Sequence, residues 1–166
     1  RGGAAEALLG GWTLNGIISI TGGTPFTIEN SDSLDWERDR SSSCESRPSL
    51  VAGQNNNPIL GNPDKWIDST AFELGPRGFF GDLSRTTGRG DDFANFDFSL
   101  GKNTRLGEAV TLQFRAEFFN VFNHPNFRHP SRQVFTSRGK VSSSFGRVGR
   151  TDNSSRQIQL GVKLLF

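Results

Sequence analysis

The residues of this chain that could do chemistry are few and far apart. Cys44 is the only cysteine among 166 residues, and His124 and His129 are the only histidines. A single cysteine excludes an internal disulfide and a cysteine-based zinc site. A metal centre would have to use mostly carboxylate ligands, and no suitable spacing of them occurs. Cys44 lies in a polar stretch and is interpreted as an exposed, incidental thiol.

Three acidic residues are candidate calcium ligands. Asp91 and Asp92 are adjacent, and Asp82 precedes them in a glycine-rich stretch. Their spacing is not that of an EF-hand, so a solvated loop is the better interpretation. His124 has no nucleophile beside it in the sequence. No nucleotide-binding loop, nucleophile elbow or catalytic carboxylate pair is recognisable. The sequence therefore predicts no enzyme, no metal and no cofactor.

The composition is typical neither of a soluble protein with a dense core nor of a disordered chain. Hydrophobic residues make up only 33%, yet there are 15 Phe and 3 Trp, which must be buried in protein or in lipid. The 19 basic and 17 acidic residues are interleaved, so no nucleic-acid partner is expected. The chain begins Arg1-Gly2-Gly3 and contains no methionine, so we expect it to be the downstream piece of a longer protein.

No run of about 20 apolar residues could form a transmembrane helix, but four segments alternate between apolar and polar residues. They are residues 11–21, 93–102, 109–122 and 156–166. Such alternation predicts β-strands with two different faces. One face carries the aromatic and aliphatic residues, which we expect to face lipid: Trp12, Ile18, Ile20, Phe96, Phe98, Leu112, Phe114 and Phe118. The other face carries charged residues expected to face a barrel lumen: Asp97, Arg115, Glu117 and Lys163.

A soluble antiparallel sheet with one wet face would show the same alternation. Three features favour a membrane barrel instead. The rest of the chain offers no second layer to cover the apolar face. The connection 103–109 is short, whereas 23–92 and 123–155 are long and polar, as in outer-membrane barrels with short periplasmic turns and long external loops. If the last strand ends in the periplasm, both long connections fall outside.

The same orientation predicts two aromatic girdles. Trp12 and Phe166 would lie near the periplasmic interface, and Phe118, Phe119 and Phe122 near the external one.

The short turn also predicts a register for the hairpin that it closes. With Lys102 opposite Val110, Phe98 would face Phe114 and Asp97 would face Arg115, pairing rings with rings and opposite charges with each other.

Three stretches of the chain resemble the C-terminal strands of Oar-like TonB-dependent receptors of the Gram-negative outer membrane. They are LGGWTLNGIISITGGTPF (9–26), FANFDFSLGKNTRLGEAVTLQFRAEFFNVFNHPNF (93–127) and FGRVGRTDNSSRQIQLGVKLLF (145–166). Residues 66–90 resemble the penultimate external loop of that family, and roughly 30–65 do not match. EFFNVFNHPNF followed by the terminal RQIQLGVKLLF is the most specific combination.

The resemblance implies a barrel of about 22 strands, a plug domain and contact with the TonB complex through a missing N-terminal part. It also implies that the barrel-assembly machinery reads a terminal aromatic residue and the apolar residues at alternating positions before it. In this chain those positions are Leu160, Val162, Leu164 and Phe166. The implied partners are outer-membrane lipid, the rest of the barrel with its plug, TonB and the assembly machinery.

The connections pose two further questions. Asn120, Asn123, His124, Pro125 and Asn126 are typical of a turn at the outer end of a strand. The aromatic residues Trp36, Trp66, Phe79 and Phe80 either stack on a captured ligand or form a small apolar cluster that orders the long connection.

We therefore expect an all-β fold, an incomplete barrel whose antiparallel strands form an open, curved sheet. Residues 1–166 would be one C-terminal fragment of a barrel domain in the cell outer membrane, in a receptor for energised uptake of a bulky nutrient or metal chelate. The alternative is a secreted or surface-exposed β-sheet module for binding or adhesion. It predicts a second sheet covering Phe96, Phe98, Leu112 and Phe114.

Overall fold

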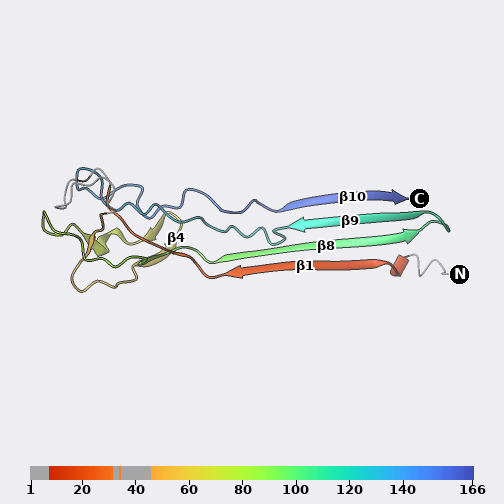
Figure 1. Ribbon diagram of the computed structural model, residues 1–166, viewed down its shortest axis with the longest axis horizontal. Coiled ribbons are helices and arrows are strands. Elements are labelled where there is room, and N and C mark those ends of the chain that lie inside the picture. The colour runs from red at the N-terminus through yellow and green to blue at the C-terminus, as the bar shows by residue number, and fades with distance from the viewer. Residues whose placement is uncertain (1–7, 32–33, 35–45) are drawn as a thin grey trace. The chain divides into compact units, whose positions relative to one another are not determined.

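A computed structural model describes residues 8–31, 34 and 46–166, and Trp36 and Cys44 lie outside these residues. The described chain is all-β apart from a helical turn at residues 8–9 and one short 3₁₀ helix (Figure 1). The elements are β1 (Trp12–Thr21), β2 (Pro25–Phe26), β3 (Ser49–Leu50), β4 (Ile59–Asn62), β5 (Lys65–Ile67), η1 (Ser69–Ala71), β6 (Phe72–Glu73), β7 (Gly88–Arg89), β8 (Phe93–Arg105), β9 (Thr111–Phe119) and β10 (Gln157–Leu165).

The four long strands form one open antiparallel sheet in the order β1-β8-β9-β10. Figure 1 shows these strands side by side, with the two outermost edges unpaired. Each strand comes from one of the four alternating segments of the sequence. The expected all-β fold with an open antiparallel sheet is thus confirmed.

Two strands differ by more than one residue from their expected ranges, which were 93–102 and 109–122. Strand β8 continues to Arg105, and β9 ends at Phe119. The early end of β9 follows from the backbone, because Asn120 and Asn123 have φ values of 50° and 52°. This left-handed conformation leaves the extended region, and asparagine tolerates it better than most residues.

The predicted register of the β8–β9 hairpin is wrong by four residues. Arg105 lies opposite Thr111, and Lys102 lies opposite Phe114 rather than Val110. The reason is the length of the turn: Leu106 N–H donates to the Val110 carbonyl at 2.9 Å, which leaves only residues 107–109 in the loop. Turn length fixes hairpin register, and it outweighs the small gain from one charge pair across the strands.

Because the shift is even, every side chain keeps its predicted face, but the partners change. Phe98 lies opposite Phe118 instead of Phe114, and Arg115 lies opposite Gly101 instead of Asp97.

The long connections were expected to be polar loops, but they fold into a compact unit of their own. Gly22–Asp92 and Asn126–Asp152 make up this loop unit, and Phe93–Pro125, Asn153–Phe166 and the described residues before Gly22 make up the sheet unit. Within the loop unit, β2 pairs with β7, β3 with β6, and β4 with β5. Its buried core is Phe26, Ile28, Leu34, Trp66, Ile67, Ala71, Phe72, Leu83, Val134, Phe135 and Phe145.

The core of the loop unit joins two stretches more than a hundred residues apart. Glu29 N–H donates to the Arg132 carbonyl at 3.1 Å, and Val134 N–H donates to the Glu29 carbonyl at 2.8 Å. Residues of the second connection therefore run parallel to residues of the first. In addition, no helix among the described residues is both long and apolar enough to cross a membrane.

Candidate functional site

The first candidate surface is the apolar face of the four-stranded sheet. The register places on this one face all eight residues expected to face lipid, with further apolar neighbours. Val162, in the middle of the edge strand β10, is 72% exposed. Ile20, near the end of the edge strand β1, is 71% exposed. Among the described residues of the sheet, Ala116 is the only buried apolar side chain. A face this large and apolar requires a non-aqueous partner.

The exposure of the central strands bears on the alternative of a soluble module. Phe96, Phe98, Leu112 and Phe114 are half-buried by their neighbours in the sheet, and none belongs to a buried core. A second sheet packed over them would have buried them.

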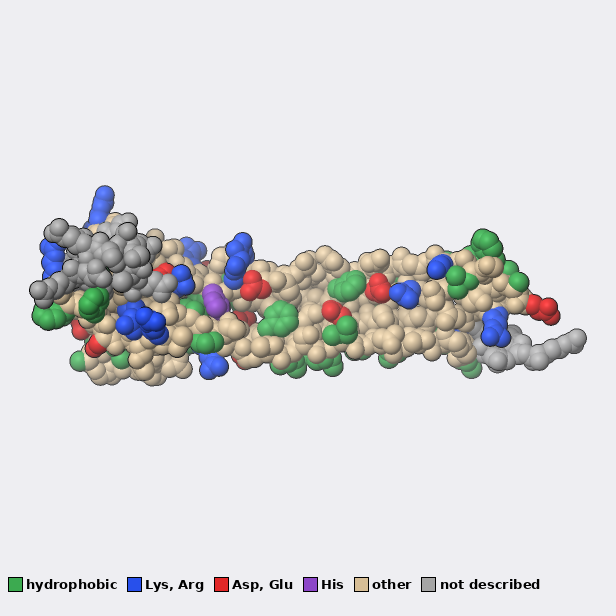
Figure 2. Space-filling model, viewed as in Figure 1, with side chains coloured by type: hydrophobic (Ala, Val, Ile, Leu, Met, Phe, Trp, Pro, Cys, Tyr) green, Lys and Arg blue, Asp and Glu red, His purple; other side chains and the backbone are tan. Residues whose placement is uncertain are grey.

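The opposite face of the sheet is polar, and Figure 2 shows acidic and basic side chains there among polar atoms. Arg115 and Glu117 form an ion pair of 3.6 Å along β9. Asn103 accepts a hydrogen bond from the Gln113 amide at 3.0 Å across the β8–β9 hairpin. Such a surface is stable only against water.

The other two charged residues of this face have different surroundings. The Asp97 carboxylate accepts the backbone N–H of Asn120 at 2.8 Å. Lys163 is exposed and lies opposite Gln113. The four residues expected at the lumen thus share one face, but the predicted Asp97–Arg115 pair does not form.

Aromatic side chains occur at both ends of the strands, as the sequence predicts. At the end with the short turn, the Lys102 ammonium lies 4.5 Å from the Trp12 ring centroid and donates to the carbonyls of Leu8 and Gly10. At the other end, Phe96 and Phe122 pack edge to face with ring centroids 5.0 Å apart. Cationic and aromatic side chains of this kind suit membrane interfaces.

The C-terminal strand presents its apolar residues on the same face as the rest of the sheet. Leu160, Val162 and Leu164 lie opposite Ala116, Phe114 and Leu112 respectively. Phe166 follows the end of β10 and is 98% exposed. All four positions of the proposed assembly signal are therefore accessible along one edge strand.

The buried side chain of Asn120, at the end of β9, joins its own turn to the chain that enters β10. Its amide donates to the carbonyls of His124 and Ser154 at 3.0 and 3.1 Å, and its oxygen accepts the His124 N–H at 2.9 Å. Next to it, the Asn123 side chain accepts the backbone N–H of Arg156 at 2.9 Å. The expected turn at the outer strand end is confirmed, and its asparagines also hold the entry of β10.

The loop aromatics bear on the two roles left open by the sequence. Trp66 is 6% exposed, lies in the core and donates its indole N–H to the Arg89 carbonyl at 2.8 Å. Phe79 and Phe80 remain exposed beside a turn in which Phe79 N–H donates to the Pro76 carbonyl. Trp66 thus belongs to the apolar cluster that orders the unit, whereas Phe79 and Phe80 lie outside it.

The three aspartates considered as calcium ligands satisfy backbone amides instead. Asp92 accepts Gly23 N–H at 2.7 Å, Asp82 accepts Leu50 N–H at 3.1 Å, and Asp91 accepts Phe127 N–H at 3.4 Å. Within residues 8–31, 34 and 46–166, no group of three or more His, Cys, Asp or Glu could hold a metal ion.

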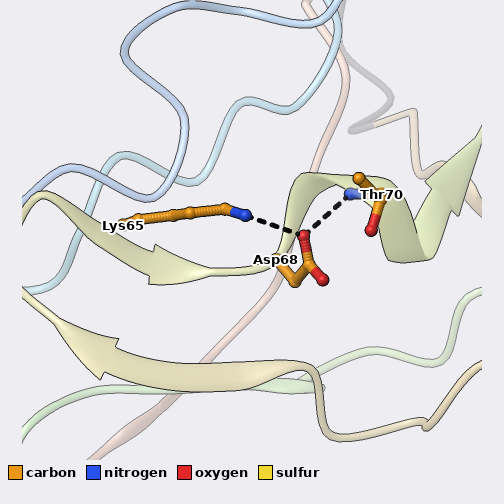
Figure 3. Close-up of polar contacts among 3 residues, drawn as sticks. All are labelled: Lys65, Asp68 and Thr70. Carbon is orange, nitrogen blue, oxygen red and sulfur yellow. Dashed lines mark hydrogen bonds and ion pairs between the residues drawn. The ribbon is translucent and has the colours of Figure 1, made fainter.

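The η1 turn contains a carboxylate whose protonation is set by its surroundings (Figure 3). The Thr70 backbone N–H donates to Asp68 at 3.2 Å, and the Lys65 ammonium lies 3.2 Å from the same oxygen. The hydrogen bond from Thr70 is the main cause that lowers the pKa of Asp68 below 3.8, and Lys65 adds to it. Asp68 thus caps the 3₁₀ helix as an anion.

His129 makes a contact that was not expected from the sequence. Its ring lies 2.6 Å from the Thr24 hydroxyl and packs on Phe26 with centroids 5.0 Å apart. Thr24 and His129 are 105 residues apart, so no local motif could have revealed the pair.

Comparison with protein families gives one match that spans most of the chain. The family model described as outer membrane beta barrel domain matches residues 1–159, which include β1, β8, β9 and the start of β10. No curated protein and no solved structure matches the chain.

Proposed function

Because this chain belongs to the outer membrane beta barrel domain family and is located in the bacterial outer membrane, we propose that it is the C-terminal barrel segment of a TonB-dependent receptor. The receptor takes up a bulky nutrient or metal chelate with energy delivered through TonB. The chain's own share of that function is to supply barrel wall, lumen lining and external loops. It has no enzymatic step.

One observation supports this proposal above all others. A single antiparallel sheet has an exposed apolar face and an opposite face lined by Asp97, Arg115, Glu117 and Lys163. Lipid can cover the first face while a water-filled lumen solvates the second. Four strands cannot close such a lumen, so the proposal requires further strands of the same barrel at the free edges of β1 and β10.

The finer identity rests on particular residues. The segment EFFNVFNHPNF (117–127) and the terminal strand RQIQLGVKLLF (156–166) resemble the ends of Oar-like TonB-dependent receptors. The structure makes the first segment a strand end with a hydrogen-bonded turn and the second an edge strand. These roles fit the C-terminal part of a barrel.

The proposal is tested by reading the gene upstream of the Arg1 codon and by an uptake assay in the native bacterium. We expect an open frame with further alternating strands, a plug domain and a TonB-contacting segment. Cells lacking the receptor and cells lacking TonB should lose uptake of the same nutrients. A start signal directly upstream of Arg1, or receptor-dependent uptake that persists without TonB, would overturn the proposal.

A further inference from the structure

The second long connection folds as one hairpin in the loop unit, here called the basic hairpin (126–152). Its two arms are joined by backbone hydrogen bonds from Arg128 N–H to the Arg150 carbonyl at 3.0 Å and from Ser131 N–H to the Arg147 carbonyl at 2.9 Å. Its tip is a tight turn in which Thr136 N–H donates to the Lys140 carbonyl at 2.8 Å. Gly139 adopts φ 70° in this turn.

The basic hairpin has a strong charge excess that the whole-chain composition conceals. It contains six basic residues and a single acidic one, Asp152. The six are Arg128, Arg132, Arg138, Lys140, Arg147 and Arg150. All six are exposed, and Figure 2 shows basic side chains standing out from the loop unit.

The first connection provides the contrast within the same unit. Residues 23–92 contain seven basic and twelve acidic side chains, so this connection carries the opposite charge. The excess is therefore a property of the basic hairpin and not of the loop unit as a whole.

Among the residues that the structure describes, three of the six basic side chains form ion pairs, and only one of these pairs is close. The Arg132–Glu29 pair is close, at 2.7 Å, and Glu29 is only 13% exposed. The Arg128–Asp152 and Arg147–Asp64 pairs are loose, at 3.7 and 3.9 Å, between exposed side chains. Such pairs contribute little.

The remaining three basic residues are Arg138, Lys140 and Arg150. None of them has an acidic partner among the described residues.

Folding of the hairpin does not depend on these charges. Val134, Phe135 and Phe145 anchor it in the buried core of the loop unit. Arg138, Lys140 and Arg150 are exposed and have no acidic partner within the described part of the chain, so they repel one another and add no ion pair to the fold there. Binding of an anion removes that repulsion.

We propose that the basic hairpin captures the substrate by its anionic groups, so that the substrate is a polyanion bearing several phosphates or carboxylates. Guanidinium groups bind such groups through paired hydrogen bonds, and a surplus of positive charge raises the rate of encounter. The inference rests on the proposed function in two respects: the external position of the hairpin and the existence of a substrate that the receptor takes up.

The test measures binding of inositol hexakisphosphate, with uncharged inositol as the neutral probe, by titration calorimetry on the full-length protein in detergent. We expect measurable binding of the hexakisphosphate alone, weakening steeply as salt is added. R138E/K140E should weaken it on the order of tenfold or more. R138K/K140R keeps the charge and should bind like the parent.

Arg85→Glu is the matched control for Arg138→Glu, because Arg85 is exposed, belongs to the same unit and lies outside the basic hairpin. Equal losses in the two single variants, or binding of inositol and its hexakisphosphate alike, would overturn the inference. The inference would also be overturned if the protein did not bind inositol hexakisphosphate but bound lipopolysaccharide through Arg138 and Lys140. The basic hairpin would then bind membrane lipid and not a substrate.

The outcome is separate from that of the proposed function. If uptake depends on TonB but the protein binds no polyanion, only the inference about the basic hairpin is rejected. If the protein binds the polyanion but uptake does not depend on TonB, only the proposal of a TonB-dependent receptor is rejected.

Discussion

Asn120 shows how much a single side chain at a strand end can determine. Its amide group meets backbone atoms of its own turn and of the chain entering β10, and its N–H meets Asp97 of β8. Strands β8 and β10 are separated by β9, so this residue connects elements that do not pair directly. Asn120 therefore acts as a clamp at the outer end of the sheet.

Replacement of Asn120 by alanine should destabilise the protein by roughly 1–3 kcal/mol, because the carbonyls of His124 and Ser154 lose their donor and the His124 N–H loses its acceptor. The positive φ of 50° adds strain for alanine. Asn120→Gly removes the strain but not the lost hydrogen bonds, so it should recover only part of the loss. Denaturant unfolding of the full-length protein in lipid measures both, with Asn56→Ala at an exposed position as control. Parental stability in Asn120→Ala would contradict the clamp.

Asp68 makes the loop unit sensitive to acid in a definable direction. Its pKa is lowered in the folded state, so its contribution to stability is present above pH 3.8 and is lost as the pH falls through the lower, folded value. Hydrogen exchange of the Thr70 amide should accelerate in the parent over that acidic range relative to Asp68→Asn. Asp64→Asn, at an exposed position, should keep the parent's pH profile. An identical profile in Asp68→Asn would count against the role of the carboxylate.

At the scale of elements, local sequence patterns predict the four strands. They do not predict the strand register or the core of the loop unit, which depend on residues far apart in the sequence. The alternation in 156–166 predicts β10 directly, because adjacent residues of a strand point to opposite faces. Register depends on turn length, and nothing in residues 103–109 shows how far β8 continues. The core of the loop unit contains both Ile28 and Val134, and no local periodicity shows that residues so far apart in the sequence share one core. The apolar pair Val134-Phe135 in a polar stretch was the available signal.

The register also changes where an arginine would be most harmful on the apolar face. Leu112 is the second residue of β9, close to the short turn, whereas Leu100 lies near the middle of β8 opposite Ala116. Leu100→Arg should cost about 2–4 kcal/mol, and Leu112→Arg less, because the penalty falls toward the membrane interface.

The control for this series is Ser99→Arg, on the polar face opposite Glu117. It should leave stability close to the parent value. Folding into lipid vesicles, followed by the shift in mobility of unheated samples on gels, measures all three variants. Similar penalties for Ser99→Arg and Leu100→Arg would show that the two faces do not meet different environments.

At the scale of the whole molecule, the long connections leave the strands of the sheet at one end and the short turn closes the other end. Antiparallel pairing places the end of β1, the start of β8, the end of β9 and the start of β10 at one end, where both long connections leave. The only turn between adjacent long strands at the opposite end is residues 106–110. Both long connections thus leave the strands at the end opposite the short turn, as a barrel with external loops and periplasmic turns requires.

Orientation in the membrane follows from that division and can be measured on living cells. In a Cys44→Ser background, Ser143→Cys places a thiol on the exposed part of the basic hairpin, and Gly107→Cys places one in the short turn, where an added Cβ meets open space. A membrane-impermeant maleimide should label Ser143→Cys on intact cells. It should label Gly107→Cys only after the outer membrane is permeabilised, because the short turn faces the periplasm. Labelling of Gly107→Cys on intact cells would place the short turn outside and the basic hairpin in the periplasm, where it could not meet an external substrate.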